Sequence, residues 1–587
     1  MPGFYGRILK IDLGNRSFTM ETVADSVYET YLGGKGLASY LLYELNPPMI
    51  DPMAPENCLI FATGPATGSS VWGSSRYGVF TKSPLTGFYS ESYSGGKVPE
   101  AIDSAGFDAV VLQGRSSEPL VLAVHPDGVD FHKAGRIWGM DTFETESVVT
   151  EKFCRRDKGF RRPGVVVIGP AAENGVHFAT IKNDGWRCAG RTGVGTVMGS
   201  KKVKAIIFQG DRKRPLYDQK AVREFARNLS SDNRDNPGVK AYKAMGTSMM
   251  VRLMNTAKGF PTRYWSASLY EDWEKISSDA LHSKCKVKPH ACLKCFMACG
   301  RMTEVKSGRH AGLKIEGPEY ETIYAFGGLC LINQIEEIIY LNNICDHLGM
   351  DTITAGNLCA FSIEAARRGK IDYAIDYGDV DAIARLLEMM VEKEGIGEVL
   401  SRGIKHAAEQ WGLEDIAIHA KGMEPPGYDP RILKGMGLGY ATSDRGACHL
   451  RATFYKPELA GMIPKEQIEG KAELFVDFED RLTLFDTLIL CRFYRDLYPW
   501  EDLCRVIHAV TGLGPDKASI RKIAVAVTDI VRRFNLREGL TTQDDRLSKG
   551  FYRKLTNTDQ VITEEQLLIM IKEYYALRGW NERGEVV

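Results

Sequence analysis

The chain is organised around Cys292-Leu293-Lys294-Cys295-Phe296-Met297-Ala298-Cys299, a C-x2-C-x3-C run near its middle. Three thiols so close together are hard to explain by packing. Thiolates are soft ligands for zinc, copper(I) or iron–sulfur clusters, and a run of three leaves one position of a tetrahedral or cubane site to a residue elsewhere. The run therefore predicts a metal site with a fourth, distant ligand.

The spacing of the cysteines favours an iron–sulfur cluster. A radical-SAM signature has the reverse order, C-x3-C-x2-C, and bacterial ferredoxins carry four cysteines in one run, so neither pattern is met. A structural zinc site needs a second Cys or His pair nearby, and His282, His290 and His310 do not give a standard spacing. We favour an iron–sulfur cluster over zinc, and either over an inert group of cysteines. Cys491, at the end of an apolar helix-like stretch, is the candidate fourth ligand.

Composition restricts the class of protein. A chain of 587 residues is expected to form two to four domains. A formal net charge of +0 gives no support for binding nucleic acid or an anionic membrane surface. The 13 cysteines, an odd number scattered over the chain, favour a reducing compartment over a disulfide framework. The N-terminus lacks an apolar signal core, and no stretch approaches the roughly 20 apolar residues of a membrane span, so we expect a soluble, cytoplasmic protein.

The order of the expected elements indicates an α+β fold. Residues 4–22 read as a hairpin with Gly14-Asn15 at its turn. Further strands are expected at Cys58–Thr63, Ala109–Gln113, Leu120–His125, Val165–Ile168 and Val203–Phe208. From about 216 onward the pattern is helical, and Pro425-Pro426-Gly427 marks a second boundary near 420. We predict a β-rich domain at 1–210 and two mainly α-helical domains at 211–420 and 421–587.

Four glycine-rich stretches interrupt the expected strands. Glycine allows backbone N–H groups to approach a ligand closely, and an adjacent Arg or Lys supplies charge for phosphate. Such loops suit a large phosphate-bearing cofactor, although a glycine-rich turn is more often only a turn. No G-x-x-x-x-G-K-[ST] motif is present, and residues 193–199 miss the dinucleotide fingerprint, which disfavours a Rossmann domain. The stretches are Gly33–Gly36, Gly64-Pro65 running on to Arg76, Ser94–Lys97 and Arg187–Gly195.

Two helical segments share a spacing. Cys345–Asp351 and Phe485–Cys491 each place an Asp four residues before an apolar residue, which on a helix puts both side chains on one face. If the segments form a pair, each serves one half of a two-fold ligand. The alternative is two amphipathic helices whose Asp residues are solvated.

In combination, these motifs resemble the tungsten-containing aldehyde:ferredoxin oxidoreductases, over essentially the whole chain and in order. The motifs are Ser75-Arg76, Lys82–Gly87, Ser94–Lys97, Ala189–Gly195 with Met198–Lys201, the C-x2-C-x3-C run, Asp346-x-x-Gly349-x-Asp351 and Asp486-x-x-x-Leu490-Cys491.

The resemblance implies a β-rich N-terminal domain that carries a bis-pterin tungsten cofactor, followed by two helical domains that close over it. One [4Fe–4S] cluster close to a pterin would be ligated by Cys292, Cys295, Cys299 and Cys491. The two pterin rings would be bound by Asp346 and Asp486, with Met350 and Leu490 as their i+4 companions.

The resemblance also implies contacts to the pterin phosphates and to the Mg²⁺ ion that bridges them. These would come from Arg76, Gly95, Arg187 and Cys188. Tyr93 stands where family members often have Asn, in a position that resembles a backbone-carbonyl contact, so the change reshapes the neighbourhood but need not abolish magnesium binding.

Substrate contacts are expected from two further segments. Gly317–Thr322 resembles the segment that holds the active-site glutamate, which is either Glu319 or Glu321, and Arg445–Leu450 resembles the segment that holds the active-site histidine, His449. A buried carboxylate and a neutral imidazole can move protons while the metal handles electrons. One of the two glutamates is expected to be only structural, and Cys448 to be packed rather than ligating.

One departure concerns assembly. Some family members carry Glu-x-x-His just before the first pterin-binding Asp, where it holds an iron between subunits. Here the positions read Tyr340-x-x-Asn343, so that iron is not expected, and a homo-oligomer is left open.

The resemblance implies that an aldehyde and water become a carboxylate, or the reverse, at a tungsten, or molybdenum, bis-pterin centre of an anaerobe. Electrons would leave singly through the [4Fe–4S] cluster. Since no second cluster or flavin motif is visible, a separate ferredoxin or an iron–sulfur electron-transfer subunit is required. One alternative is a low-potential reductase such as the tungsten subunit that reduces benzoyl-CoA. Another, of a different class, is a non-catalytic iron–sulfur electron carrier.

Overall fold

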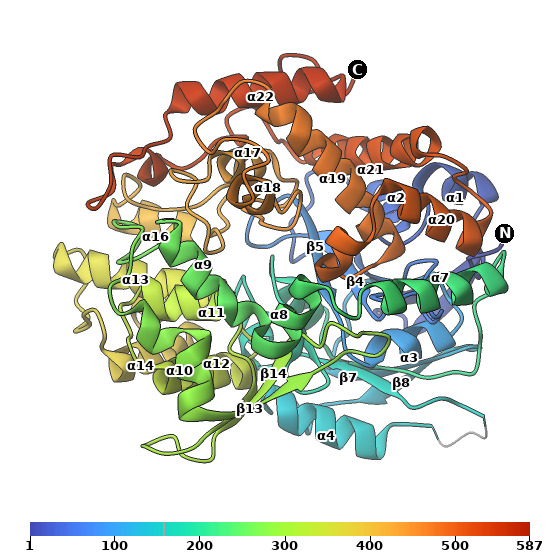
Figure 1. Ribbon diagram of the computed structural model, residues 1–587. Coiled ribbons are helices and arrows are strands. Elements are labelled where there is room, and N and C mark those ends of the chain that lie inside the picture. Colours follow the sequence, from blue (N-terminus) through green and yellow to red (C-terminus); the bar gives the residue numbers. More distant parts are fainter. Residues whose placement is uncertain (156–158) are drawn as a thin grey trace. The chain divides into compact units, whose positions relative to one another are not determined.

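The computed structural model describes residues 1–155 and 159–587 (Figure 1). The chain forms two compact units, and each is assembled from separate stretches of sequence. The first unit contains Met1–Val239, Ala291–Met297 and Asp480–Gly539. The second contains Lys240–His290, Ala298–Glu479 and Leu540–Val587. The division into domains at 210 and 420 stays a prediction.

Two mixed six-stranded sheets form the base of the first unit within the described residues. In the first sheet, in the order β2-β1-β6-β3-β4-β5, β1 and β6 are parallel and the other neighbours antiparallel. Its strands are β1 (Arg7–Asp12), β2 (Ser17–Thr22), β3 (Leu59–Ala62), β4 (Tyr77–Lys82), β5 (Tyr89–Ser94) and β6 (Ala109–Gln113).

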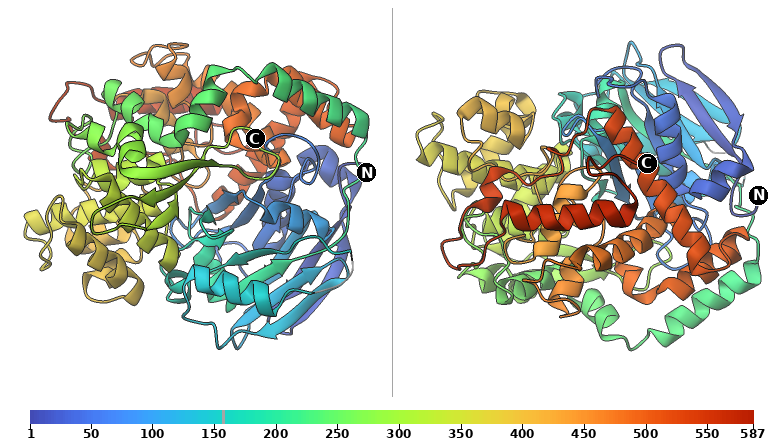
Figure 2. Two further views of the ribbon diagram at one scale, coloured as in Figure 1. Left: turned by 60° about the horizontal axis from the view of Figure 1, so that its bottom comes forward. Right: turned by 90° about the horizontal axis from the view of Figure 1, so that it is seen from above.

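The second sheet has the order β11-β10-β9-β12-β7-β8, and β12 and β7 are parallel. Phe61 of β3 and Phe208 of β12 pack with ring centroids 5.9 Å apart, so the two sheets meet at an apolar contact. Figure 2 shows the blue and cyan strands of these sheets as neighbouring layers. The strands are β7 (Leu120–His125), β8 (Gly128–Lys133), β9 (Gly164–Val167), β10 (Ile181–Asn183), β11 (Arg187–Ala189) and β12 (Val203–Phe208).

Helices from distant parts of the sequence complete the first unit. Helix α4 (Thr142–Lys152) covers β9 and β12. Helix α21 (Lys517–Arg537) packs against α1 (Asp25–Tyr31) and α2 (Gly34–Leu45). Two more, α7 (Gln219–Asp232) and α20 (Trp500–Thr511), contact each other. The C-terminal half of α19 (Lys471–Leu488) also belongs to this unit.

The second unit is largely helical. Helices α12, α13 and α14 pack on one another, and α17 packs on α22. A three-stranded antiparallel sheet in the order β13-β14-β15 accompanies them. The bounds are α12 (Ile335–Leu348), α13 (Thr352–Arg367), α14 (Val380–Glu392), α17 (Lys434–Thr442), α22 (Glu564–Arg578), β13 (Cys285–His290), β14 (Gly300–Val305) and β15 (Lys314–Glu316).

The cysteine run occupies the loop between β13 and β14. His290 pairs with Gly300 at the base of this loop, and the run lies between them. The stems of the hairpin belong to the second unit, whereas loop residues Ala291–Met297 belong to the first. The run is therefore presented on a loop rather than on a helix.

The predicted mixed α+β character is confirmed. The N-terminal hairpin and the strands expected near Cys58–Thr63, Ala109–Gln113, Leu120–His125, Val165–Ile168 and Val203–Phe208 are present as β1–β2, β3, β6, β7, β9 and β12. The small sheet β13–β15 was not expected from the sequence. No helix among the described residues is long and apolar enough to cross a membrane.

Candidate active site

The loop that carries Cys292 and Cys295 is fixed by backbone hydrogen bonds in the first unit. The Leu293 N–H donates to the Gly96 carbonyl at 3.2 Å, and the Gly73 N–H donates to the Lys294 carbonyl at 2.9 Å. Gly96 and Gly73 lie in two of the glycine-rich stretches. These stretches therefore hold the cysteine loop.

Cys491 is attached to the same glycine. Its N–H donates to the Gly73 carbonyl at 2.9 Å, so Gly73 bridges the cysteine loop and the segment after α19. The Arg76 Nη1 lies 3.9 Å from the Cys491 Sγ, and the Tyr494 hydroxyl lies 3.5 Å from the Cys295 Sγ. Each of these two thiols thus has a hydrogen-bond donor beside it.

Cys292 lies in a crowded position between charged groups. A Cβ atom added to Gly95 would stand 2.8 Å from the Cys292 Sγ, so a side chain there would displace the thiol. Burial raises the pKa of the Cys292 thiol and Cys491 adds to the rise, whereas Arg187 and Arg76 oppose it. The two guanidinium groups are placed to stabilise thiolate ligands.

Tyr93 and Cys188 lie near these residues in the first unit. The Tyr93 carbonyl accepts a hydrogen bond from Arg76 Nη2 at 3.3 Å, so it is the backbone oxygen that faces the arginine. Cys188 lies in β11, which is paired with β10. The Asn183 Nδ2 of β10 donates to the Gly95 carbonyl at 3.0 Å and so links β10 to the glycine turn.

Two glycines permit a close approach of the C-terminal end of α19. A Cβ atom on Gly34, whose φ is +49°, would stand 2.5 Å from the Asp486 carbonyl oxygen. A Cβ atom on Gly64 would meet the Leu488 carbonyl within 3.0 Å, a distance that real Cβ atoms essentially never show. Each glycine thus has a packing role. The sequence alone could not distinguish this role from phosphate binding.

The two Asp segments have the same backbone geometry. In each, the helix ends two residues after the Asp, and the next residue is left-handed: Gly349 has a φ of +79° and Ile489 a φ of +53°. The N–H of the following residue, Met350 or Leu490, donates to the carbonyl of the residue before the Asp, at 2.9 and 2.7 Å. This six-to-one hydrogen bond defines a Schellman helix end.

The helix ends correct one expectation. Met350 and Leu490 were expected to share a helix face with Asp346 and Asp486, but both lie beyond the helix, so the i+4 relation does not apply. The signal for a helix end was present in Gly349 and absent at Ile489, because a β-branched residue is rare in the left-handed region. The partners also differ: Asp346 accepts from Asn342 Nδ2 at 2.7 Å, and Asp486 pairs with Arg492.

In the second unit, Glu321 and His449 come together. The Glu321 Oε1 lies 3.7 Å from the His449 Nε2, and the Gly427 N–H donates to the Glu321 Oε2 at 2.9 Å. The His449 ring stacks on Tyr428 with centroids 5.9 Å apart, and Tyr428 stacks on Tyr455 at 4.1 Å. The carboxylate and the imidazole are thus oriented by a backbone amide and an aromatic stack.

Glu319 has a different environment. Its Oε2 accepts a hydrogen bond from the Thr247 hydroxyl, which in turn accepts from the Tyr320 N–H at 2.9 Å. Glu319 precedes the short helix α11 (Tyr320–Thr322) as its N-cap residue. Through these contacts Glu319 fixes the start of α11.

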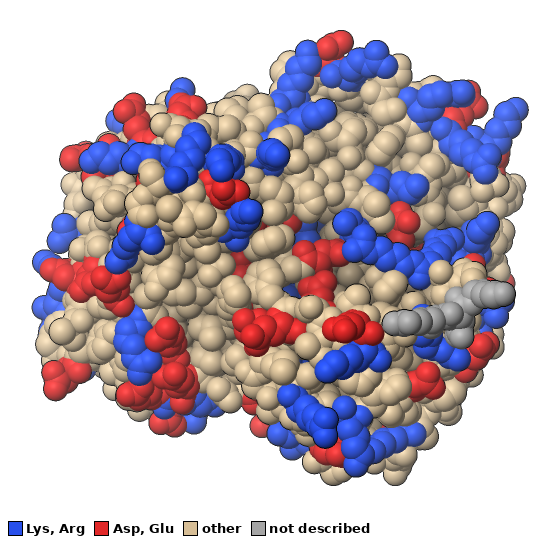
Figure 3. Space-filling model, turned by 90° about the horizontal axis from the view of Figure 1, so that it is seen from below, with Lys and Arg blue, Asp and Glu red and all other residues tan. Residues whose placement is uncertain are grey.

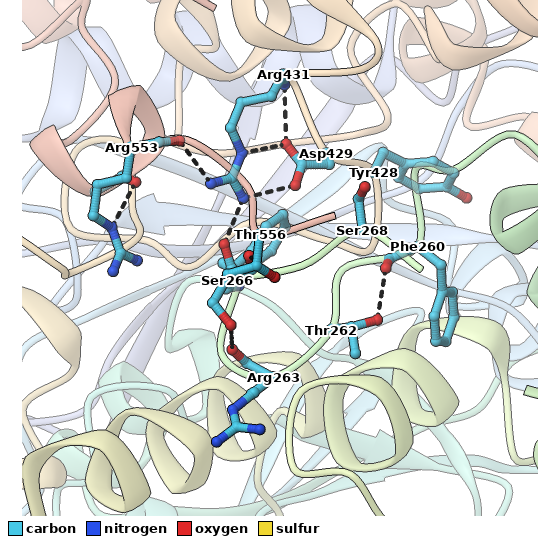
Figure 4. Close-up of polar contacts among 12 residues, drawn as sticks. Phe260, Thr262, Arg263, Ser266, Ser268, Tyr428, Asp429, Arg431, Arg553 and Thr556 are labelled. Carbon is cyan, nitrogen blue, oxygen red and sulfur yellow. Dashed lines mark hydrogen bonds and ion pairs between the residues drawn. The ribbon is translucent and has the colours of Figure 1, made fainter. Parts of the chain in front are cut away.

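The loop that presents Tyr428 is held by a buried ion pair. Arg431 pairs with Asp429 at 2.7 Å, and both side chains are fully buried. Figure 4 shows Arg431 reaching toward Arg553, whose carbonyl accepts from Nη1 at 3.3 Å; Nη2 donates to the Trp265 carbonyl at 2.7 Å. Tyr428 and this ion pair carried no motif signal, because each is recognisable only after the chain has folded.

Cys448 is buried beside His449 and accepts several hydrogen bonds. Arg445 approaches the Cys448 Sγ with Nε at 3.3 Å and Nη2 at 3.0 Å, and the Leu450 N–H lies at 3.3 Å. Burial raises the pKa of this thiol, but Arg445 and Arg451 outweigh it, so the pKa is lowered overall. Cys448 is packed, as expected, and it also anchors an arginine.

Cys299 lies in the second unit, just after the chain leaves the first. Among residues 1–155 and 159–587, no group of three His, Cys, Asp or Glu side chains stands close enough to hold a single metal ion. The joint ligation of one cluster by Cys292, Cys295, Cys299 and Cys491 stays a prediction.

Comparisons with known proteins cover the whole chain. Residues 8–210 match the family model described as the N-terminal domain of aldehyde ferredoxin oxidoreductase, and residues 224–586 match its domains 2 and 3. The chain is 34% identical to the tungsten-containing aldehyde ferredoxin oxidoreductase of Pyrococcus furiosus, over 100% of this chain and 98% of the relative. It is also 27% identical to the WOR-like subunit of an aliphatic sulfonate oxidoreductase from the same organism, over 100% and 96%.

A solved structure shares the fold. The active site complex BamBC of benzoyl coenzyme A reductase, solved with 1,5-dienoyl-CoA, superposes with a TM-score of 0.83 at 22% identity, over 100% of this chain and 96% of that one. At this identity the likeness concerns the fold alone. The matched sequence models and the full-length identity together show that this chain is an enzyme of the aldehyde ferredoxin oxidoreductase family.

Proposed function

We propose that this protein is a tungsten bis-pterin oxidoreductase that oxidises an aldehyde to a carboxylate and passes the electrons through one [4Fe–4S] cluster to ferredoxin or an iron–sulfur partner subunit. The observation that carries this proposal is the attachment of the cysteine loop and Cys491 to one residue, Gly73, with Arg76 and Arg187 beside the thiols. The 34% identity to tungsten-containing relatives supports the choice of metal.

The residues fit the groups that the family implies. Cys292, Cys295 and Cys491 of the first unit form no disulfide, and soft sulfur ligands beside guanidinium groups suit an iron–sulfur cluster. Cys299 is proposed as the fourth ligand. Arg76 and Arg187 have the charge and the planar donors that phosphate needs.

The cofactor contacts are proposed by motif. We assign the phosphates and the bridging Mg²⁺ to Arg76, Gly95, Arg187 and Cys188, with Tyr93 contributing its carbonyl. The two pterin rings are assigned to the helix ends at Asp346 with Met350 and at Asp486 with Leu490. The shared geometry of these helix ends supports treating them as an equivalent pair.

When bound, the tungsten centre supplies two-electron chemistry, and the conversion of an aldehyde and water to a carboxylate releases two electrons and three protons. Glu321 and His449 are assigned to hold and move these protons. The Gly427 N–H binds Glu321 Oε2 and leaves Oε1 on the side of His449. Tyr428 fixes the plane of the imidazole by stacking.

The choice of Glu321 over Glu319 can be tested with a matched pair of variants. We expect Glu321→Gln to lower kcat by roughly 10²- to 10⁴-fold, the usual contribution of a general acid or base. Glu319→Gln removes the carboxylate that Thr247 contacts and should lower kcat much less. Equal loss in both variants, or a larger loss in Glu319→Gln, would overturn the assignment.

The substrate class is tested by a comparison of reactions. The enzyme, purified without oxygen, is assayed with aliphatic and aromatic aldehydes and a viologen dye, and separately with an aryl-CoA thioester and a low-potential reductant. Dye reduction that depends on aldehyde supports the proposal. Turnover of the thioester alone would make the enzyme an aryl-CoA reductase, and turnover of neither in tungsten-loaded protein would contradict both assignments.

A further inference from the structure

A basic pocket lies beside the cysteine loop in the first unit. It has a volume of 290 Å³ and is lined in part by Arg161, Lys213, Arg214, Arg223 and Lys294. Lys294 stands between Cys292 and Cys295 in the sequence, so one wall of the pocket is part of the cysteine loop itself. Arg161, Lys213, Arg214 and Arg223 of the lining lie outside the motifs that indicate the cofactor site.

Most of the positive charge in the pocket is not neutralised. Asp103, the acidic residue of the lining, pairs with Arg214 at 2.8 Å, and Arg214 also pairs with Asp108. In the part of the chain that the structure describes, no carboxylate forms an ion pair with Lys213, Arg223 or Lys294. These three side chains therefore present their charge to the outside.

The same region is accessible to a large partner. Lys213, Arg223 and Lys294 are exposed, and Leu293, next to Lys294, is an exposed large apolar side chain with 38% of its surface accessible. An apolar side chain beside cations is a combination that suits a protein surface with complementary charge. On the face that Figure 3 shows, Lys and Arg side chains lie among Asp and Glu side chains.

The pocket is rigidly connected to the thiols. The Lys294 carbonyl accepts from Gly73, which also binds Cys491. The Trp72 Nε1 donates to the Ala226 carbonyl at 2.7 Å and thereby ties the residue before Gly73 to helix α7, which carries Arg223. The Trp72 ring also packs on Phe296 of the cysteine loop with centroids 5.2 Å apart. A protein bound at the pocket would therefore be held next to Cys292 and Cys295.

We propose that this basic surface, formed by Lys213, Arg223 and Lys294 with Leu293, docks an acidic iron–sulfur electron carrier that takes electrons from the cluster at the cysteine loop. The inference rests on the proposed function, which requires an external acceptor. Two electrons from one aldehyde leave singly and reduce two molecules of a one-electron carrier. The acidic surface of the carrier steers its approach and fixes its orientation.

The test compares a protein acceptor with a small dye. The holoenzyme oxidises an aldehyde with either an acidic bacterial [4Fe–4S] ferredoxin or benzyl viologen as acceptor. In the double variant Lys213→Glu/Arg223→Glu we expect the KM for ferredoxin at low ionic strength to rise about tenfold or more, because attraction is replaced by repulsion. The dye-linked rate should stay within about twofold of the wild type, since the substituted side chains are exposed surface charges.

A graded and a matched control accompany this variant. Lys213→Gln/Arg223→Gln removes the charges without reversing them and should give an intermediate KM. Lys370→Glu reverses one exposed charge in the second unit and should change neither rate. For the wild type, the KM for ferredoxin should rise with added salt as the charges are screened.

A direct titration separates failure of this proposal from failure of the proposed function. Binding of ferredoxin to the wild type and to the double variant is measured by calorimetry without substrate, so the result does not require aldehyde turnover. Unchanged affinity and unchanged KM in the double variant would overturn the docking surface even if aldehyde oxidation is confirmed. Saturable binding of inorganic phosphate together with no binding of ferredoxin would also overturn it and make the pocket a small-anion site.

Discussion

The helix ends that carry Asp346 and Asp486 have a similar backbone conformation but are stabilised by different contacts. At the end of α12, the left-handed residue is Gly349, and the carboxylate partner is the neutral amide of Asn342. At the end of α19, the left-handed residue is Ile489, and the partner is the guanidinium of Arg492. Gly34 and Gly64 press against the second helix end.

This difference shows whether the left-handed turn at each helix end is specified by the local sequence or by tertiary packing. Glycine adopts the left-handed conformation without a Cβ clash, so the end of α12 is specified locally. A β-branched residue adopts it only when its surroundings over-determine the backbone, and such strain is typical of functional sites. The end of α19, three residues before Cys491, is therefore positioned by tertiary packing.

The largest effect is expected from removing the charged partner. Arg492→Leu removes the ion pair that Arg492 forms with the buried Asp486 carboxylate and should lower the free energy of unfolding by about 3–5 kcal/mol. Asn342→Leu removes one hydrogen bond from Asp346 and should cost about 1–3 kcal/mol. Anaerobic chemical denaturation measures both. Equal costs would show that the two helix ends do not differ as described.

The next effect is expected from filling the space that a glycine leaves. In Gly64→Ala the new Cβ would meet the Leu488 carbonyl, so the helix end must shift, and this should lower the free energy of unfolding by about 3 kcal/mol. The variant should also lose iron, because Cys491 lies just beyond this helix end. Thermal unfolding and iron analysis provide the readout. Gly135→Ala is the matched control, because nothing stands within 4 Å of its Cβ position. Normal stability and iron content in Gly64→Ala would contradict the role of packing.

A smaller effect is expected where the turn is local. Gly349→Ala introduces a Cβ at a φ of +79° and should lower the free energy of unfolding by about 1 kcal/mol. Thermal unfolding measures this change. Iron content should stay at the wild-type value, since Cys491 follows the other helix end. Loss of iron in this variant would mean that the two helix ends are not independently supported.

The smallest effect concerns a cysteine outside both helix ends. The pKa of Cys448 is lowered from 9.0 in the folded protein, so folding favours its thiolate. Its contribution to stability should be fully present above about pH 9 and should be lost as the pH falls through the folded pKa. Denaturation of wild type and Cys448→Ser across this range should show a stability difference that shrinks on acidification. A constant difference would contradict the lowered pKa.

Much of the fold was predictable from local patterns. The buried strands with long apolar runs, such as β7 and β12, were recognised, because an apolar run bounded by turn residues identifies a strand. The short strand β11 (Arg187–Ala189) and the charged strand β13 (Cys285–His290) were missed, since neither has an apolar run. Their pairing is visible only after folding.

The candidate site was predictable only as far as motifs extend. The cysteine run, the two Asp residues and His449 were found from spacing and resemblance. Gly73 was expected only as part of a glycine-rich stretch. Its link between the cysteine loop and Cys491, Tyr428 and the Asp429–Arg431 ion pair were not found, because they act through contacts between segments far apart in the sequence. The same reason explains why Met350 and Leu490 were wrongly placed on helices.

The most direct test of the account is the metal content of protein purified without oxygen from a tungstate-supplied host, measured by elemental mass spectrometry for the wild type and for Cys491→Ala. The account predicts about one tungsten and about four irons per wild-type chain, the iron of one cubane cluster, and loss of the iron in the variant. Iron that is unchanged in Cys491→Ala, or zinc in place of iron in the wild type, would contradict it.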